Sequence, residues 1–155
     1  MRPARRRGPE AVRRECRSVW RKAPAVRLLL DTHVAIWAVS SVETLPESVA
    51  AMIAEPANEV SVSMASLWEI AIKNSLGPRR TAIGLSTTQA IEEFTATSFE
   101  VLPIEVRHAL GVERLPHLHG DPFDRLLIAT AEADTYRLVT HDRALAAYGD
   151  YVILV

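Results

Sequence analysis

Four carboxylates occupy positions where a buried strand ends or a helix begins, and they are the side chains best placed to do chemistry: Asp31, Glu69, Asp124 and Asp142. Like charges that are brought together repel one another unless a cation neutralises them, and carboxylate oxygens are hard ligands that favour Mg²⁺ or Mn²⁺. A divalent cation held in this way can activate a water and clamp the oxygens of a phosphodiester. These residue types therefore indicate metal-dependent phosphodiester hydrolysis, provided that the fold brings them together.

Short apolar runs that alternate with helical patterns supply the elements that must position these carboxylates. The runs predict strands over 27–30, 59–63, 99–104, 136–140 and 151–155. The helical patterns lie at 32–39, 46–54, 64–76, 87–97, 104–113, 122–134 and 142–148. Strands that alternate with helices imply crossover connections and a parallel sheet covered on both faces. The predicted fold class is α/β, a three-layer α/β/α sandwich with a mainly parallel sheet of about five strands.

This topology predicts that the four carboxylates lie close together. In an α/β sheet the carboxyl ends of the strands and the amino ends of the covering helices share one edge, and ligands bind there. Asp31 and Asp142 follow predicted strands, whereas Glu69 and Asp124 lie in the first turns of predicted helices. We therefore expect all four side chains at one rim of the sheet.

Two of these aspartates can also be explained as helix caps. Asp31 or Thr32 can cap the helix that follows the first strand, and Asp142 or Thr140 can cap the last helix. Either explanation accounts for one aspartate taken alone. The expected convergence of four acids on one edge is what favours a functional site.

Glu69 has a structural explanation of its own. Ser66 and Glu69 have the spacing of a capping box, and Glu69 precedes Lys73 by four residues, which is the favourable spacing for an ion pair on a helix. The neighbouring Trp68 and Ile70 indicate a largely buried flank, which a surface ion pair does not require. We therefore keep Glu69 among the candidate site residues.

The segment before the helix at 122–134 offers two further interpretations. Asp121 followed by Pro122 is typical of an N-cap and a first helical position, which leaves Asp124 free to point at the site. His117, His119 and Asp121 suggest a zinc hydrolase, but no further histidine follows at close spacing to complete such a motif. A solvated turn accounts better for the two histidines.

Other site chemistries find less support in the sequence. The start Asp31-Thr32-His33 is like an aspartyl-phosphatase loop, but that chemistry requires a second aspartate where His33 stands. Cys16 has no nearby histidine that would activate it as a nucleophile. The chain contains neither GxGxxG nor GxxxxGK[ST], so a phosphate-cradling glycine loop is not indicated.

Four blocks of the sequence together resemble PIN-domain proteins of the VapC toxin type. They are LLLDTH at 28–33, SLWEIAIK at 66–73, HGDPFDRLLIA at 119–129 and LVTHD at 138–142. The resemblance runs from about residue 26 to residue 155 with the blocks in family order. It implies a compact α/β/α fold and endoribonuclease activity that depends on Mg²⁺ or Mn²⁺.

The resemblance also implies roles for individual residues and for partners. Carried over by position, Asp31 and Asp124 are the main metal ligands, Glu69 and Asp142 complete the acidic pocket, and Asp121 supports it. The implied partners are an RNA substrate and a small cognate antitoxin whose C-terminal segment wraps the toxin and blocks the site. We further expect a homodimer. Two alternatives stay open: a DNA- or structure-specific nuclease of the same fold, and a non-catalytic binding module.

Charge is distributed unevenly along the 155 residues. Residues 1–27 carry ten Arg or Lys and two Glu, whereas the remaining 128 residues carry 8 basic and 17 acidic side chains. We interpret residues 1–25 as a basic extension outside the folded domain or a misassigned start, with RNA attachment as the rival, and 26–155 as the nuclease domain. Candidate phosphate contacts, or else solvated surface charges, are Arg79, Arg80, Arg107, Arg114 and Arg125.

Composition excludes several classes of protein. Hydrophobic residues make up 48% and charged residues 24% of the chain, which is globular rather than disordered composition. No apolar run approaches the ~18 residues of a membrane span, and the first 25 residues lack the apolar region of a secretory signal. A single cysteine allows no internal disulfide. We expect a cytoplasmic protein that does not contact a membrane.

Overall fold

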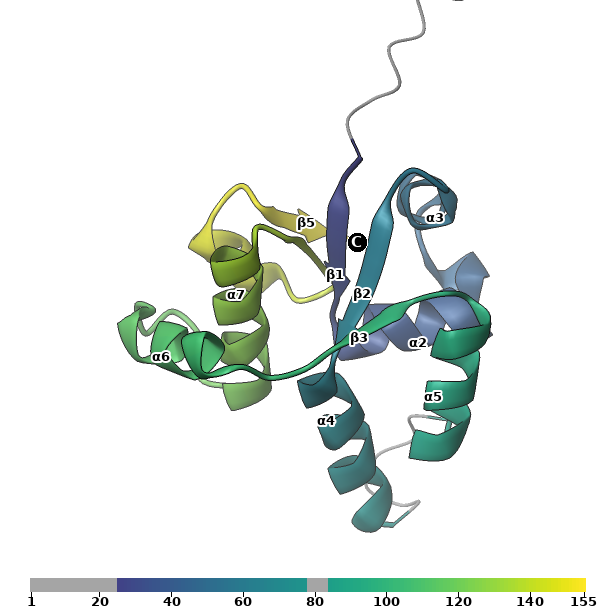
Figure 1. Ribbon diagram of the computed structural model, residues 1–155, viewed down its shortest axis with the longest axis horizontal. Coiled ribbons are helices and arrows are strands. Elements are labelled where there is room, and N and C mark those ends of the chain that lie inside the picture. The colour runs from purple at the N-terminus through teal and green to yellow at the C-terminus, as the bar shows by residue number, and fades with distance from the viewer. Residues whose placement is uncertain (1–24, 78–83) are drawn as a thin grey trace, which may run out of the picture.

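The computed structural model describes residues 25–77 and 84–155, and its centre is a five-stranded sheet (Figure 1). The strands are β1 (Arg27–Leu30), β2 (Glu59–Ser63), β3 (Glu100–Leu102), β4 (Arg137–Thr140) and β5 (Val152–Leu154). Their order is β3-β2-β1-β4-β5, and every neighbouring pair is parallel. The predicted α/β class and parallel sheet are therefore confirmed.

The order of the strands creates a switch point between β1 and β4. The chain adds β2 and β3 on one side of β1 and then returns to place β4 and β5 on the other side. The helices that follow β1 and β4 therefore leave in opposite directions and open a crevice at the carboxyl ends of these two strands. The backbone N–H of Asp31 donates to the carbonyl of Val139 on β4 at 2.9 Å. Asp31 therefore lies at the entrance of this crevice.

Helices cover both faces of the sheet. They are α2 (Thr32–Ser40), α3 (Glu47–Ala54), α4 (Met64–Ser75), α5 (Thr87–Ala96), α6 (Val106–Arg114) and α7 (Pro122–Asp134), with short 3-10 helices η1 (Val42–Thr44) and η2 (Arg143–Tyr148). In Figure 1 α6 and α7 lie on one side of the sheet, and α2, α3 and α5 lie on the other. This is the expected three-layer arrangement.

Two hydrophobic clusters fill the space on either side of the sheet. Leu28 and Leu30 of β1 point into one cluster, where Ile70 of α4 and Phe94 of α5 are fully buried. Leu29 points into the other cluster, which contains residues of α7, β4 and η2. Successive side chains of β1 thus pack into the hydrophobic clusters on opposite faces of the sheet. Because both faces of the strand are buried, every residue of the run at 28–30 is apolar.

The observed elements agree with the predicted ones apart from their ends. The third strand is shorter than predicted, and η1 was not predicted. The last helix is a 3-10 helix, in which the N–H of Leu145 donates to the carbonyl of Asp142 at 3.1 Å. Such i→i+3 bonding tightens a short segment that has to turn at once into β5.

The described residues start at Ala25 and include no membrane-spanning helix. The proposed N-terminal extension, residues 1–25, lies outside the described residues except for its last residue. Among the described residues, no helix has both the length and the apolar character needed to cross a membrane.

A prediction follows from the cluster beneath α7. Leu138 on β4 is fully buried, and the substitution Leu138→Ala should lower the free energy of unfolding by about 2–5 kcal/mol because it removes buried surface and leaves a cavity. Leu154 on β5 is 41% exposed, so Leu154→Ala should cost less than about 1 kcal/mol. Urea denaturation of both variants measures the difference. Equal losses would contradict the placement of β4 in the core.

Candidate active site

Asp31 lies at the crevice between β1 and β4 and is 4% exposed. One carboxylate oxygen accepts the N–H of Val34 at 2.7 Å, which caps α2. The other oxygen faces the backbone N–H of His141 at 3.3 Å and its ring Nδ1 at 3.4 Å. Burial raises the pKa of Asp31, but hydrogen bonds from His141, Thr140 and Val34 outweigh burial and hold the pKa below its ordinary value. Asp31 is therefore a buried carboxylate that stays ionised.

The amino end of α7 brings two more aspartates to the same place. Asp121 is the N-cap, and its Oδ1 accepts the N–H of Phe123 at 2.8 Å and that of Asp124 at 3.3 Å. Its expected capping role is confirmed. Asp124, one turn into the helix, points its carboxylate into the crevice instead. The two aspartates therefore have different roles: Asp121 caps the helix, and the carboxylate of Asp124 is available to a ligand.

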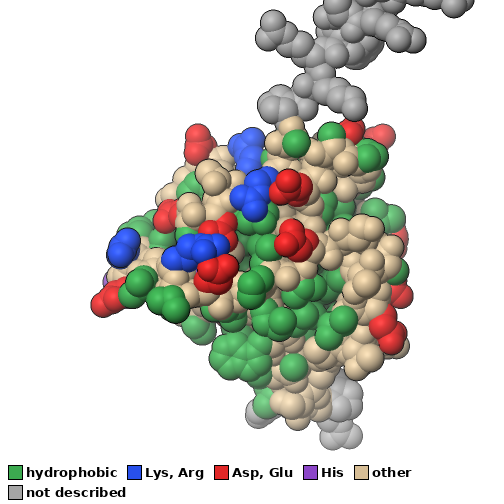
Figure 2. Space-filling view, viewed as in Figure 1, with side chains coloured by type: hydrophobic (Ala, Val, Ile, Leu, Met, Phe, Trp, Pro, Cys, Tyr) green, Lys and Arg blue, Asp and Glu red, His purple; other side chains and the backbone are tan. Residues whose placement is uncertain are grey.

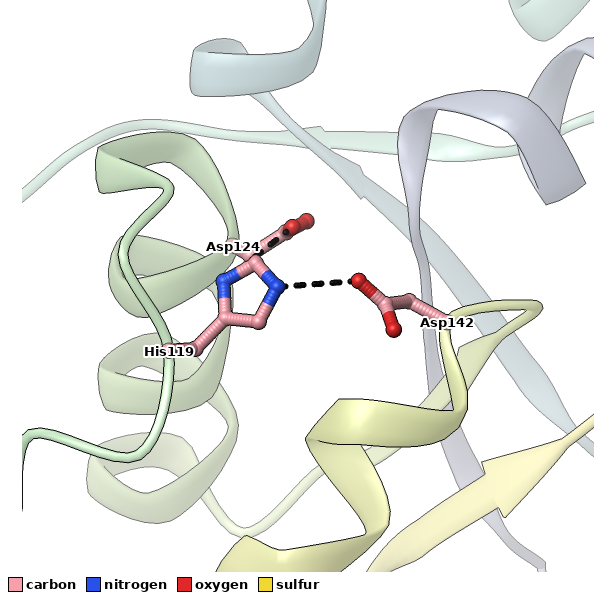
Figure 3. A group of neighbouring side chains, drawn as sticks. All are labelled: His119, Asp124 and Asp142. Atoms are coloured by element: carbon pink, nitrogen blue, oxygen red, sulfur yellow. Dashed lines mark hydrogen bonds and ion pairs between the residues drawn. The ribbon is translucent and has the colours of Figure 1, made fainter.

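Figure 3 shows the ring of His119 facing Asp142 and lying beside Asp124. Its Nε2 lies 2.9 Å from Oδ2 of Asp142, and its Nδ1 lies 3.6 Å from Oδ2 of Asp124. The other oxygen of Asp142 accepts the N–H of Ala144 at 2.8 Å, so Asp142 caps η2 as the sequence suggested. Three ligand atoms, one from each of these residues, lie within 4.8 Å of one another, which is close enough to hold a metal ion together.

Glu69 forms another wall of the crevice. Its Oε2 accepts the hydroxyl of Thr32 at 2.5 Å, and its Oε1 pairs with Nζ of Lys73 at 2.5 Å. The side chain is 13% exposed. The expected ion pair with Lys73 is confirmed, whereas the cap of α4 is Ser63 rather than Ser66. Glu69 thus reaches the site while its i,i+4 pair stabilises the helix.

All of these groups line one cavity of about 220 Å³. Its walls comprise Asp31, Thr32, His33, Glu69, Lys73, Asp121, Asp124, His141 and Asp142. Every carboxylate that the sequence placed at the rim, Asp121 included, is present. The convergence inferred from topology is therefore observed in the fold.

Burial and the repulsion among the carboxylates of this cavity disfavour the ionised form of Asp124. Its pKa is raised to about 6, first by burial and then by the charge of Asp121, with smaller contributions from Asp31 and Asp142, while His119 opposes the rise. The contact with His119 therefore does not fully compensate the charge of this carboxylate. Oxygen donors gathered around an uncompensated charge fit a hard divalent cation such as Mg²⁺ or Mn²⁺.

His33 of α2 and His141 after β4 line the cavity, and Trp37 packs behind His141. His141 packs edge-on against His33, with ring centroids 4.8 Å apart, and against Trp37 at 5.2 Å. The hydrogen bond to Asp31 raises the pKa of His141, whereas burial followed by the charge of Lys73 lowers the pKa of His33. The charged form is therefore favoured at the ring that touches Asp31.

Arg125 fixes the loop that carries His119, and it is not a surface group. It is 9% exposed, and its guanidinium donates to the carbonyls of Pro116, Val112 and Leu115 at 2.9, 2.9 and 3.3 Å. These carbonyls lie at or just beyond the carboxyl end of α6, where a cation is favourable. The interpretation of Arg125 as a phosphate contact is wrong, because it already binds these carbonyls inside the protein.

The remaining candidate phosphate contacts fare differently. Arg107 pairs with Glu105 and with Asp134, the latter at 2.7 Å, so it is committed to other carboxylates. Arg114 is exposed at the end of α6. Arg79 and Arg80 lie outside the described residues. Among the described residues that line the cavity, Lys73 is the lysine or arginine.

Sequence reasoning missed His119 and misjudged Trp68. His119 was interpreted as part of a solvated turn, but it contacts two of the acids, and its position just before the N-cap Asp121 was the available signal. Trp68 is 58% exposed rather than buried, and its ring meets Phe123 edge-on at 5.4 Å. Leu67 and Ile70 take the buried side of α4, which turns Trp68 outward.

Comparisons with known proteins agree with this architecture. A family model described as PIN domain matches residues 28–151. Ribonuclease VapC22 of Mycobacterium tuberculosis is 35% identical over 123 residues, which are 78% of this chain and 91% of that protein.

Solved structures with the same fold include two complexes. VapBC2 from Rickettsia felis, bound to a DNA fragment from their promoter, has a TM-score of 0.61 at 16% identity and covers 84% of this chain and 98% of its own. DNA-bound VapBC from Salmonella typhimurium has a TM-score of 0.58 at 18% identity, with 84% and 97% covered. At this identity the likeness establishes the fold alone.

The uncompensated charge of Asp124 leads to a prediction about stability. Because its pKa is higher in the folded state, ionisation costs folding free energy as pH rises through about 4 to 6, and this cost is fully present above that window. Without metal, Asp124→Asn should therefore be more stable than the parent at pH 7.5, by about 1–2 kcal/mol after allowance for solvent screening. The gain should shrink towards pH 4.

Thermal and urea unfolding in chelator measure this effect. Asp150→Asn, at an exposed carboxylate outside the cavity, is the matched control and should change stability by less than about 0.5 kcal/mol at either pH. Addition of Mg²⁺ or Mn²⁺ at pH 7.5 should stabilise the parent more than Asp124→Asn. A destabilised Asp124→Asn at pH 7.5 would show that the carboxylate is already compensated.

Proposed function

The chain belongs to the PIN-domain family, and on that premise we propose that it is a metal-dependent endoribonuclease that acts as the toxin of a toxin–antitoxin pair. The observation that carries the proposal is the cavity at the switch point, where the acids converge and the charge of Asp124 is not fully compensated. An arrangement that costs stability is expected where function requires it.

The proposed metal ligands are Asp31 and Asp124, with Asp142 and Glu69 completing the pocket and Asp121 supporting it. The low pKa of Asp31 keeps it ionised, and the orientation of Asp124 leaves its oxygens open to the cavity. When bound, Mg²⁺ or Mn²⁺ supplies the positive charge that activates a water and offsets charge on a phosphate in hydrolysis. The same donor set accepts either ion, and we propose Mg²⁺ as the resident one.

The chain's own residues then bind and orient the substrate. Lys73, a cationic side chain in the wall of the cavity, is proposed to contact an oxygen of the scissile phosphate. Its pair with Glu69 and the hydroxyl of Thr32 fix the direction of that carboxylate. A carboxylate of the pocket accepts the proton of the attacking water, which raises the rate by general-base catalysis.

RNA is the proposed substrate because the relative with 35% identity is named a ribonuclease. The acidic cavity offers no means of sensing the 2′-hydroxyl on its own. A DNA-directed nuclease of the same fold is therefore the second candidate, and the two differ in a direct assay. With RNA as substrate, the proposed place of action is the cytoplasm.

A small antitoxin protein is the proposed partner, since structures of this fold include VapBC complexes. Two features support it. A pocket of carboxylates attracts a guanidinium as well as a metal, and an arginine would pair bidentately there. Hydrophobic side chains also gather on the surface over β3 and α4 (Figure 2). On α4 itself, Met64 and Trp68 are 45% and 58% exposed, and Ile104 after β3 is 42% exposed. Such surfaces mark interaction sites.

We also propose that residues 26–155 form the nuclease domain, that residues 1–25 are dispensable for cleavage, and that the protein is a homodimer. The family match over residues 28–151 supports the boundary. Cleavage by a chain that begins at Ala25, compared with the full chain, addresses the boundary directly.

Cleavage of matched oligonucleotides tests the proposed function. With Mg²⁺ or Mn²⁺ the parent should cut RNA, and excess chelator should abolish cleavage. Asp31→Asn keeps the shape and the capping ability of the side chain but removes its charge, so the rate should fall by about 100-fold or more. The melting temperature should fall moderately while the chain still folds, because the hydrogen bonds of His141 to the ionised carboxylate are lost. Asp150→Asn should retain the parental rate.

Each outcome of this assay has a clear meaning. Cleavage of DNA and not of RNA would replace the proposed substrate by the second candidate. A folded Asp31→Asn that cuts at the parental rate would overturn the assignment of the site. No cleavage of either polymer by the parent, over a range of metal concentrations, would favour a binding module.

Growth of the host tests the toxin role separately. Expression of the parent without a partner should slow growth, because free RNA cleavage harms the cell. Asp124→Ala should relieve this effect, since it removes a proposed metal ligand from the cavity. Immunoblots establish that both chains accumulate equally. Equal growth rates at equal expression would count against a toxin.

A further inference from the structure

His119 occupies a place that the proposed function does not yet use. It lies on the loop before α7, and its ring faces Asp142 and lies beside Asp124 (Figure 3). The ring is largely buried, with 16% of the side chain exposed. Both ring nitrogens face a polar neighbour, so the hydrogen bonds can define which nitrogen carries the proton.

The backbone determines the tautomer of this ring. The N–H of Asp121 donates to Nδ1 of His119 at 3.2 Å, so Nδ1 must supply a lone pair. In a neutral imidazole the proton is then on Nε2, which donates it to Oδ2 of Asp142 at 2.9 Å. The same tautomer leaves Nδ1 without a proton for Asp124, whose Oδ2 lies 3.6 Å away. His119 therefore donates a hydrogen bond to Asp142 and none to Asp124.

The two aspartates consequently differ in how much of their hydrogen-bonding capacity is used. Asp142 accepts from His119 with one oxygen and from the N–H of Ala144 with the other. Within residues 25–77 and 84–155, no group donates a hydrogen bond to the carboxylate of Asp124, and its ion-pair contact with His119 is at 3.6 Å. Asp142 is held in one orientation, and Asp124 is open.

We propose that His119 is a positioning residue that orients the carboxylate of Asp142 through its Nε2 proton, beside the proposed metal ligand Asp124. The inference rests on the proposed function and deepens it, because it names the residue that holds a supporting acid of the site in one orientation. Partners of this kind that orient metal ligands are worth about 10–100-fold in metal affinity or activity.

The scaffold supports such a role because it immobilises the loop. The buried guanidinium of Arg125 donates to the carbonyls of Pro116 and Leu115, which precede His119 by three and four residues. At its other end the loop is held by Asp121, which caps α7. A ring on a loop that is bonded at both ends can define the orientation of a carboxylate on another element.

Nitrogen NMR of the full chain, with ¹⁵N-labelled histidine and without metal, tests the tautomer independently of any activity. In the neutral form of the ring, the His119 signals should show a protonated Nε2 and an unprotonated Nδ1. His119→Gln identifies the signals by their disappearance. A protonated Nδ1 in the neutral ring would overturn the proposal, because Nε2 could then donate nothing to Asp142.

Calorimetric titration of Mn²⁺ into the metal-free full chain tests the consequence. His119→Ala should weaken binding by about 10–100-fold. His119→Gln should stay within about threefold of the parent, because the amide nitrogen of glutamine can replace the Nε2 donor. His117→Gln, at an exposed histidine of the same loop, is the matched control and should bind as the parent does. Melting temperatures of the metal-free variants separate a loss of fold from a loss of affinity.

The outcomes distinguish this proposal from the proposed function. Parental affinity in a folded His119→Ala, or a loss in His119→Gln as large as in His119→Ala, would overturn the positioning role even if RNA is cleaved. A parent that binds Mn²⁺ with the expected ranking of variants but cuts no RNA would refute the proposed function and leave the role of His119 standing.

Discussion

The repulsion among carboxylates at one edge of the sheet is the constraint on which the rest of the structure depends. Asp31, Asp121, Asp124 and Asp142 line a single cavity with Glu69, and such charges are costly to gather in a half-buried place. The fold compensates by aiming backbone N–H groups at them. Asp31, Asp121 and Asp142 each cap the helix that follows, so the helix N-termini meet the carboxylates that need neutralising.

Hydrogen bonds compensate the charges of these carboxylates to different degrees, and the pKa values of Asp31 and Asp124 therefore shift in opposite directions. Asp31 is the more buried of the two proposed ligands, yet its pKa is held low by hydrogen bonds from His141, Thr140 and Val34. Asp124 is less buried but receives no such bonds from the described residues, and its pKa rises to about 6. The difference is one of hydrogen-bond partners rather than of burial. A cation that entered the cavity would therefore relieve the charge on Asp124 above all.

Capping a helix and lining the cavity are not alternatives for a carboxylate in this protein. For Asp31, Asp142 and Glu69, a structural role seen in the sequence competes with a functional one when each residue is judged alone. The structure shows that one oxygen of Asp31 and one of Asp142 serve a helix cap while the other faces the site. Glu69 divides its oxygens between Lys73 and Thr32 at the cavity wall. A carboxylate has two oxygens, so a single residue can hold a helix and face a ligand at once.

The sequence by itself determined the order and type of the elements, because period-2 and period-3.6 patterns depend on neighbours a few residues apart. It also determined that the acids converge, because parallel topology brings strand ends and helix starts to one edge. Only the tertiary structure decided that Arg125 turns inward to bind carbonyls, that Trp68 turns outward, and that His119 pairs with Asp142 beside Asp124. These outcomes depend on contacts such as that between His119 and Asp142, which lie 23 residues apart in the chain. A local pattern carries no information about which side chain will occupy the space beside another when the helices pack.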